Sequence, residues 1–410
     1  MTHISACRLC GGTKLVNVLD FGNVAFTGIF PQNAEEEIPF GKLNVIFCEE
    51  CSLAQLGESF PAEELYGDNY GYRSGLNKSM VTHLETTVKR LMNISELYPG
   101  DVVCDIGSND ATLLNSYKIE GIQKIGIDPT INKYRNFYRD DTIPLADFFS
   151  SAAYFGHLEQ KAKIVTSIAM FYDLEDPVAF AKDIHSILDD NGIWHFEQSY
   201  TPWVLRTGSF DTICHEHLEY YSLKTIKHIL DLSEFDIIGV STNAINGGSI
   251  SVTATPKTHR SRDLPIQAKW LLQMEESHAF NTLEAWSTFS QIVERHKYDL
   301  LKLLTQLNED KQVTLGLGAS TKGNVLLQVM DIDSSLLPCI GEVNEYKWGR
   351  VTPGTNIPIV SEKEILDMKP DNVLVLPWHF RETFVRNLRP NIESGMKIIF
   401  PLPEVEIIGY

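Results

Sequence analysis

The chain has 410 residues, of which 54 are acidic and 35 basic, so its formal net charge is −19. That length exceeds one small domain and predicts two or three units with real cores. A strongly acidic chain repels a phosphate backbone, which argues against nucleic acid as the main partner and favours a small-molecule substrate.

The sequence shows no membrane or export signal. No apolar run is long enough to span a bilayer, and the start, MTHISACRLC, lacks the charged and apolar regions of a secretion signal. We therefore expect a cytoplasmic protein without a membrane partner, either a monomer or a small homo-oligomer.

Two CxxC pairs lie in the first 65 residues and contribute Cys7, Cys10, Cys48 and Cys51. Four thiolates on two short knuckles can hold one tetrahedral ion without strain, and closed sites of this kind usually staple small domains. An iron–sulfur or catalytic thiol centre is the alternative. We expect a structural zinc ion in a zinc-binding domain over residues 1–65.

The middle section, residues 66–309, alternates strands and helices after a first helix. This alternation predicts a mostly parallel, doubly wound sheet, with two later strands joined at a Gly-Gly turn as an antiparallel finish. The expected helices cover 76–91, 178–188 and 265–309, and the expected strands cover 101–106, 124–129, 163–171, 192–198, 235–243 and 247–256.

The last section, residues 310–410, repeats the same pattern on a smaller scale. VTLGLGASTKGNVLLQVM reads as strand, Gly-rich loop and helix, and NVLVLPWHF and KIIFPLP contain later strands. A second, smaller α/β unit is therefore expected.

The loop in DIGSND has the features of a cofactor site. Gly107 and Ser108 let backbone amides approach a ligand, and Asp105 ends a strand where open α/β sheets bind ligands. Asp128 ends the next strand and can accept both hydroxyls of a ribose. The fingerprint GxGxxG is missing, so S-adenosylmethionine fits better than a nicotinamide cofactor, although such a loop can also be only a tight turn.

The order of motifs resembles a known family. CRLCGG, GSND, FDTICHEHLEYYSL, NGGSI, GASTKGN, GRVTPGTNIPI and LPWHF occur as in the three-domain sugar C-methyltransferases, over essentially the whole chain. The resemblance implies an α/β protein with a doubly wound methyltransferase core, an N-terminal zinc-binding subdomain and a smaller C-terminal Rossmann-like domain. It also implies methyl transfer from S-adenosylmethionine to a ketosugar carried on a nucleoside diphosphate, in deoxysugar or surface-polysaccharide biosynthesis.

The resemblance and the loop together suggest binding residues. Lys322 can pair a diphosphate at a helix start, and Glu197 ends a strand together with His195 and Gln198. For the cofactor we expect Asp105, Gly107, Ser108, Asn109, Asp128, Asp147 and Met170. For the nucleotide-sugar, placed between core and tail, we expect Tyr221, Glu197, Ser320, Lys322 and Asn324.

The segment FDTICHEHLEYYS concentrates titratable groups. By the resemblance His217 is the base that removes the proton next to the ketone, Glu216 orients it, and Tyr72 or Tyr221 donates to the enolate oxygen.

The chain departs from the family at two positions near this chemistry. Cys214 stands where family members have a tyrosine, and Met170 stands where they have a histidine. The candidate catalytic residues are His217, Glu216, Tyr72, Cys214 and His215.

Other functions stay open at this stage. A sugar O-methyltransferase, with or without a second metal on Cys214, His215, Glu216 and His217, fits the same segment. The segment can also be a polar loop that caps the sheet. A non-enzymatic zinc-headed binding module and a nicotinamide-dependent sugar oxidoreductase are the alternatives from other classes.

Overall fold

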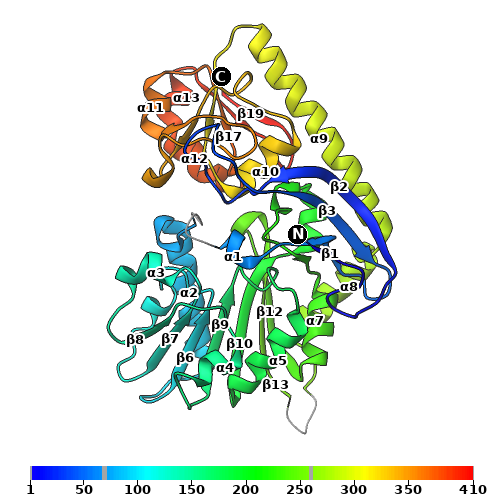
Figure 1. Ribbon diagram of the computed structural model, residues 1–410, viewed down its shortest axis with the longest axis vertical. Helices are drawn as coiled ribbons and strands as arrows, with labels where there is room; N and C mark the ends of the chain where they lie inside the picture. The colour runs from blue at the N-terminus through cyan, green and yellow to red at the C-terminus, as the bar shows by residue number, and fades with distance from the viewer. Residues whose placement is uncertain (1, 67–71, 258–261, 410) are drawn as a thin grey trace.

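The computed structural model describes residues 2–66, 72–257 and 262–409. Its main sheets form a central domain, a smaller C-terminal domain and an N-terminal head that lies along the side of both (Figure 1). Among the described residues, no helix combines the length and apolarity that a bilayer crossing needs.

The central sheet has seven strands and confirms the predicted doubly wound core. Five strands pair in parallel. At one edge β13 pairs antiparallel with both β10 and β12, as the Gly-Gly turn predicted, so β13 alone runs against the other strands of this sheet. The spatial order is β12 (Phe235–Asn243), β13 (Ser249–Pro256), β10 (Leu188–Ser199), β9 (Ala162–Ile168), β6 (Val102–Ile106), β7 (Gln123–Ile127) and β8 (Thr142–Leu145).

Helices cover this sheet because each presents one apolar stripe to it. The predicted first helix is α2 (Lys78–Ile94), which begins where the Asn77 side chain accepts from the Ser79 amide and buries Met80, Leu84, Val88 and Leu91. The others are α3 (Ile131–Tyr134), α4 (Ser151–Phe155), α5 (Pro177–Ile187), α6 (Thr201–Thr207) and α7 (Leu223–Leu232).

The head is a small antiparallel sheet that includes a strand from the central domain. Strand β11 (Glu219–Tyr220), directly after the CHEH segment, pairs with β4. The head and the CHEH segment are therefore built as one unit. The head contains β1 (Thr2–His3), β2 (Leu15–Ala25), β3 (Phe40–Cys48), β4 (Ala54–Leu56), β5 (Glu58–Ser59) and α1 (Ala62–Leu65).

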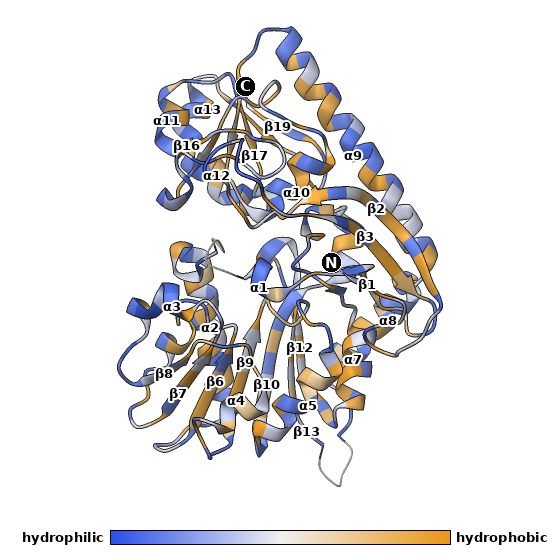
Figure 2. Ribbon diagram, viewed as in Figure 1, coloured by the Kyte–Doolittle hydropathy of each residue, from blue (hydrophilic) through white to orange (hydrophobic). Residues whose placement is uncertain are grey.

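The stretch predicted as helical over 265–309 forms two helices, α8 (Ile266–Ser277) and α9 (Leu283–Glu309). Figure 2 shows hydrophobic and hydrophilic patches alternating along α9, as expected for a helix with one buried face. This helix leads from the central domain to the C-terminal one (Figure 1).

The C-terminal domain has a six-stranded sheet, parallel except for its last strand. Its spatial order is β16 (Ile359–Ser361), β15 (Ile340–Glu342), β14 (Thr314–Leu317), β17 (Asn372–Val375), β18 (Lys397–Phe400) and β19 (Glu406–Ile408). Its helices are α10 (Thr321–Val329), α11 (Glu362–Asp367), α12 (Arg381–Asn387) and α13 (Arg389–Glu393).

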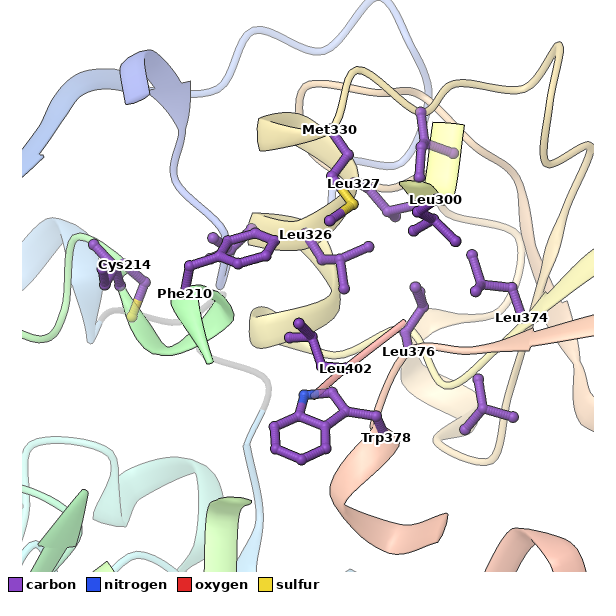
Figure 3. Packing of buried hydrophobic residues seen from close by; sticks show 14 of the residues in the cluster. Phe210, Cys214, Leu300, Leu326, Leu327, Met330, Leu374, Leu376, Trp378 and Leu402 are labelled. Carbon is purple, nitrogen blue, oxygen red and sulfur yellow. The ribbon is translucent and has the colours of Figure 1, made fainter. Parts of the chain in front are cut away.

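Two hydrophobic clusters tie the three parts together. One joins the head strands, α9 and the C-terminal domain, and it includes Phe210 and Cys214 beside Leu326 and Trp378 (Figure 3). The other joins the cysteine knuckles of the head to the central sheet. The head therefore packs against both domains, and the CHEH segment lies where all three meet.

Candidate functional site

A cavity of about 300 Å³ lies at the carboxyl ends of the parallel strands of the central sheet, the edge at which open α/β sheets bind ligands. Its described lining contains six carboxyl side chains and no Lys, Arg or His. Such a wall favours a ligand with net positive charge and disfavours a diphosphate. The carboxyl groups belong to Asp105, Asp128, Asp147, Asp173, Glu175 and Glu197.

The loop after β6 is shaped to let a ligand close to the backbone. Gly107 has φ of +73° and donates its amide to the Ile127 carbonyl at 2.8 Å. A Cβ on Gly107 would lie 3.0 Å from Cγ of Met170, so a side chain there would press on the cavity wall. Asp105, 3% exposed, accepts from Thr166 Oγ1 at 2.6 Å.

Asp128 lines the cavity but already serves the protein. Its Oδ2 accepts from the Asn109 amide at 2.9 Å, and Oδ1 accepts from the amide and the hydroxyl of Thr130. A carboxylate has about four lone-pair positions, so about one remains for a ligand. The expectation that Asp128 accepts both ribose hydroxyls is therefore corrected: the arrangement leaves room for one.

The remaining predicted cofactor residues also border the cavity. Ser108 Oγ lies 2.7 Å from Tyr138 Oη, and Asn109 Nδ2 donates to the Tyr72 carbonyl at 3.2 Å. Asp147 is exposed at the end of β8, and Met170 is half-buried in the loop after β9.

Tyr72 lies at the rim of the same cavity with about half of its surface exposed. Its carbonyl also accepts from Tyr134 Oη at 2.8 Å, which ties it to α3. Residues 69–71 of the NYGYRS motif lie outside the described residues.

Within the CHEH segment, His217 stands out. Every residue from 208 to 223 is buried except His217, which keeps accessible surface. Its Nδ1 lies 2.7 Å from the Thr212 carbonyl, and its ring packs on Tyr172 with centroids 4.1 Å apart. Because a carbonyl can only accept, the proton sits on Nδ1 and the Nε2 lone pair is left to act as a base.

Burial, together with the nearby Lys322 ammonium, lowers the pKa of His217 to about 3. The imidazole is therefore neutral at physiological pH. Glu216 does not provide its orientation, contrary to the expectation, because the Thr212 carbonyl does so. The Glu216 carboxyl is turned toward the head, where a Cβ on Gly28 would lie 2.7 Å from Oε1.

Two other residues of the segment are structural, which corrects their assignment as catalytic. His215 is fully buried between the rings of Phe26 and Phe60, with Nε2 3.2 Å from the Gly41 carbonyl. Cys214 is 1% exposed within the hydrophobic cluster, and burial raises the pKa of its thiol.

Within the described part of the chain, only the four head cysteines form a cluster able to hold a metal ion. Their ligand atoms lie within 4.8 Å of one another. This compact arrangement fits one tetrahedral ion. The second metal considered for the CHEH segment finds no ligand cluster there.

Several expected substrate residues are packed into the protein instead. Tyr221 is 1% exposed and stacks on Phe171, so its assignment as a substrate contact is wrong for this structure. His195, at the same strand end as Glu197, is fully buried between Thr253 and Arg90, and burial lowers its pKa to about 3. Its role is structural.

Glu197 does line the cavity. Its two carboxylate oxygens accept one contact each, from His83 Nε2 and Asn243 Nδ2, both at 2.7 Å.

Two residues of the GASTKGN motif make contacts within the protein, and a third lies beside the cavity. Ser320 caps α10 by accepting from the Gly323 amide at 3.0 Å, and Asn324 is fully buried and donates to the Thr27 carbonyl of the head. Both are therefore structural contacts rather than the expected substrate contacts. Lys322 Nζ donates to the Asn246 carbonyl at 2.6 Å, and Asn246 lines the cavity.

Sequence reasoning did not single out a pair that closes the domain interface. Trp378 of the LPWHF motif donates its indole N–H to Asp211 Oδ2 at 2.8 Å, and Lys322 lies close enough to Asp211 to lower its pKa against the effect of burial. Both residues stand inside quoted motifs, but no local pattern joins positions so far apart. Asp173 was also missed, although it lies in the loop that follows β9.

Comparisons with known proteins agree with this architecture. Three family models match in order: a "Putative zinc binding domain" over residues 7–66, a "Methyltransferase domain" over 80–240 and a "C-methyltransferase C-terminal domain" over 244–403. The C-methyltransferase NovU of Streptomyces niveus is 27% identical over 411 residues, covering 99% of this chain and 97% of NovU.

Two solved structures match less than half of the chain. An S-adenosylmethionine-dependent methyltransferase from Clostridium acetobutylicum is 10% identical, with a TM-score of 0.35 over 43% of this chain and 92% of its own. Magnesium protoporphyrin IX methyltransferase from Synechocystis, solved with bound SAH, is 16% identical, with a TM-score of 0.34 over 47% of this chain and 91% of its own.

The fold and the acid-lined cavity define an S-adenosylmethionine-dependent methyltransferase with a zinc-binding head. In particular, the three domain models match along the chain in order, and the C-methyltransferase NovU is similar to it over nearly the full length of both proteins.

The cavity also fits the methyl donor on physical grounds. S-adenosylmethionine carries a sulfonium, an ammonium and one carboxylate, so its net charge is positive and it suits a wall of carboxyl groups. Gly107 and the cofactor loop admit its backbone contacts, and Asp128 has an acceptor position left for a ribose hydroxyl. When bound, the cofactor supplies an electrophilic methyl group.

Proposed function

We propose that this enzyme methylates a carbon next to the ketone of a sugar carried on a nucleoside diphosphate, with His217 as the base. The observation that carries the proposal is the state of His217. It keeps accessible surface in a segment that is otherwise buried, and the Thr212 carbonyl fixes its tautomer with Nε2 free.

The residues around His217 support an anionic substrate beside it. Lys322 lies at the boundary between core and tail, near both His217 and His379. Burial first, and then the Lys322 ammonium, lowers the pKa of each imidazole. A diphosphate that pairs with Lys322 would offset this cation and raise the pKa of His217. Substrate binding would then strengthen the base at the moment when it is needed.

The charge distribution separates the two ligands. The carboxyl-lined cavity disfavours a diphosphate, whereas Lys322 lies outside that wall and contacts it only through Asn246. The cofactor then occupies the acidic cavity, and the nucleotide part lies toward the tail domain. The sugar ring lies between the two, within reach of both the methyl donor and His217.

The protein's part in the reaction follows from these positions. His217 Nε2 accepts the proton from the carbon next to the ketone, and the Thr212 carbonyl stabilises the imidazolium through Nδ1–H. The electron pair left on that carbon forms the new carbon–carbon bond to the methyl group. The bond from methyl to sulfur breaks toward sulfur, and S-adenosylhomocysteine and the methylated sugar leave.

Replacement of His217 by Asn tests this assignment. The variant keeps a side chain that can donate to the Thr212 carbonyl but has no base. We expect turnover on a panel of nucleoside-diphosphate ketosugars to fall by roughly a hundredfold or more, with S-adenosylmethionine affinity nearly constant by calorimetry. Full activity in the variant would place the base elsewhere.

Solvent exchange separates carbon from oxygen methylation. With S-adenosylhomocysteine bound, an enzyme that removes the carbon-bound proton should wash deuterium from the solvent into the position next to the ketone. An O-methyltransferase should not exchange that position and should give a methyl ether by mass spectrometry. A methyl ether without exchange would replace the carbon reaction by the hydroxyl one.

A further inference from the structure

Two polar side chains in the wall of the acidic cavity carry atoms without a hydrogen-bond partner in the described chain. Gln198 is 1% exposed, and neither its Oε1 nor its Nε2 makes a hydrogen bond. Asp173 interacts with the Tyr66 side chain, but its Oδ1 makes no hydrogen bond. A buried amide without partners destabilises the fold unless a ligand satisfies the group.

The neighbouring residue on β10 has its hydrogen bonds satisfied, so the missing partners of Gln198 are not a general property of this strand end. Glu197, one residue before Gln198 on β10, is 3% exposed, and both of its oxygens are satisfied by His83 and Asn243. The sheet end therefore supplies partners where the protein needs them, and it leaves the Gln198 amide free toward the cavity.

Gln198 and Asp173 come from adjacent parallel strands. Gln198 lies near the end of β10, and Asp173 lies in the loop that follows β9. The two strand ends are held together because the Ala169 amide donates to the Glu197 carbonyl at 2.7 Å. Asp173 also follows Met170, which packs on Gly107 of the cofactor loop. Both groups thus open into one cavity beside the methyl donor.

The chemistry of the pair suits an oxygen atom of an acceptor. The Gln198 amide offers two N–H donors and a carbonyl. Burial raises the pKa of Asp173 well above its ordinary value, against a hydrogen bond from Tyr66 and with the added charge of Glu216. This shift favours the protonated carboxyl, which offers an O–H donor. Donors of this kind stabilise an oxygen that gains negative charge during a reaction.

We propose that Gln198 and Asp173 hold the oxygen of the methyl acceptor by donating hydrogen bonds to it. This assignment rests on the proposed function, in which that oxygen is the ketone of the sugar.

Matched substitutions at the two positions test the pair. Gln198→Met keeps the volume of the side chain and removes the amide. Asp173→Asn keeps N–H donors, whereas Asp173→Leu has a similar shape and no donor. Gln123→Met, on an exposed glutamine at the start of β7, is the control. Each variant is titrated with S-adenosylhomocysteine, then with thymidine-, uridine-, guanosine- and cytidine-diphosphate 4-ketosugars, and assayed for methyl transfer.

We expect Gln198→Met to weaken ketosugar binding by about tenfold and to lower turnover by roughly 10²-fold, the range for losing one donor to a developing oxyanion. Asp173→Leu should lose turnover to a similar extent, and Asp173→Asn should recover most of it. S-adenosylhomocysteine affinity should stay within about twofold of the wild type in all variants, which also shows that they fold.

Three results would overturn the proposal in distinct ways. Wild-type turnover and KM in Gln198→Met would remove Gln198 from the acceptor site. An Asp173→Asn variant as inactive as Asp173→Leu would mean that Asp173 acts as a carboxylate and not as a donor. If the wild type itself binds none of the ketosugars, the proposed substrate class fails and this assignment falls with it.

Discussion

Trp378 of the tail domain donates its indole N–H to the buried carboxylate of Asp211 in the central domain, at 2.8 Å. Asp211 begins the segment that leads to His217, so one side-chain contact joins the tail domain to the candidate base. The tail therefore holds the segment in place as well as contributing Lys322 beside it.

Trp378→Phe should weaken this junction. The substitution keeps an aromatic ring in the cluster and leaves Asp211 Oδ2 without its donor, which costs about 1–3 kcal/mol for a buried charged group. We expect a lower denaturation midpoint and a reduced turnover together. Trp270→Phe, on a tryptophan that is 64% exposed, is the matched control and should change neither. Equal midpoints in both variants would show that the junction adds no stability.

Cys48→Ser should release the metal and destabilise more than the head. Cys48 is fully buried, and the cysteine knuckles share a hydrophobic cluster with the central sheet, so the loss of one of four thiolates loosens that packing too. We expect less than one zinc per chain by elemental analysis and a lower Tm. Cys339→Ser, outside the cluster of four, should retain both. Full zinc content in Cys48→Ser would contradict the site.

Asp128→Asn should weaken S-adenosylmethionine binding by about 1.5–3 kcal/mol, the range for hydrogen bonds to a charged group. The side-chain nitrogen of the new asparagine cannot accept a hydrogen bond. Either the contact from Asn109 or the contact from Thr130 is therefore lost, and the cofactor loop is weakened along with the ribose contact. Calorimetry measures the change. Asp141→Asn, on an exposed carboxylate that pairs with Lys124, should bind the cofactor like the wild type. An unchanged affinity in Asp128→Asn would place the ribose elsewhere.

Cofactor affinity should depend on pH through Asp105. Burial, and then the charge of Asp128, raises the pKa of Asp105 from 3.8 to about 7. Below pH 7 the folded protein holds a proton that a positively charged ligand disfavours. S-adenosylmethionine should therefore bind more tightly as the pH rises to about 7, by up to about tenfold per unit, and then level off.

The unliganded protein should show the opposite trend with pH. Because the folded state binds more protons than the unfolded state between about pH 4 and pH 7, the contribution of Asp105 to stability falls as the pH rises through this window. Calorimetric titrations across this range measure the affinity, and denaturant unfolding measures the stability. Asp105→Asn should flatten both profiles, and a flat wild-type profile would mean that Asp105 is not coupled to the cofactor.

The metal site and the alternating core could be predicted from the amino-acid sequence. The site can be inferred from the two CxxC pairs without the tertiary structure. Each short knuckle brings two thiolates together, and one ion bound by all four thiolates joins the pairs. The strands that end at Ile106 and Ile127 could be predicted equally well, because short apolar runs that alternate with amphipathic helices are typical of a parallel sheet. Their ends in turn fix the cavity edge and the cofactor loop.

Which residue of the CHEH segment can act as a base depends on the tertiary structure. Neighbouring residues of an irregular segment point in different directions, and their environments come from distant parts of the chain. His215 is buried because Phe26 and Phe60 of the head enclose it, while His217 keeps accessible surface because Thr212 holds its ring against Tyr172. No local pattern encodes those partners, so a run of four titratable residues leaves the base undetermined until the head and both domains have packed around it.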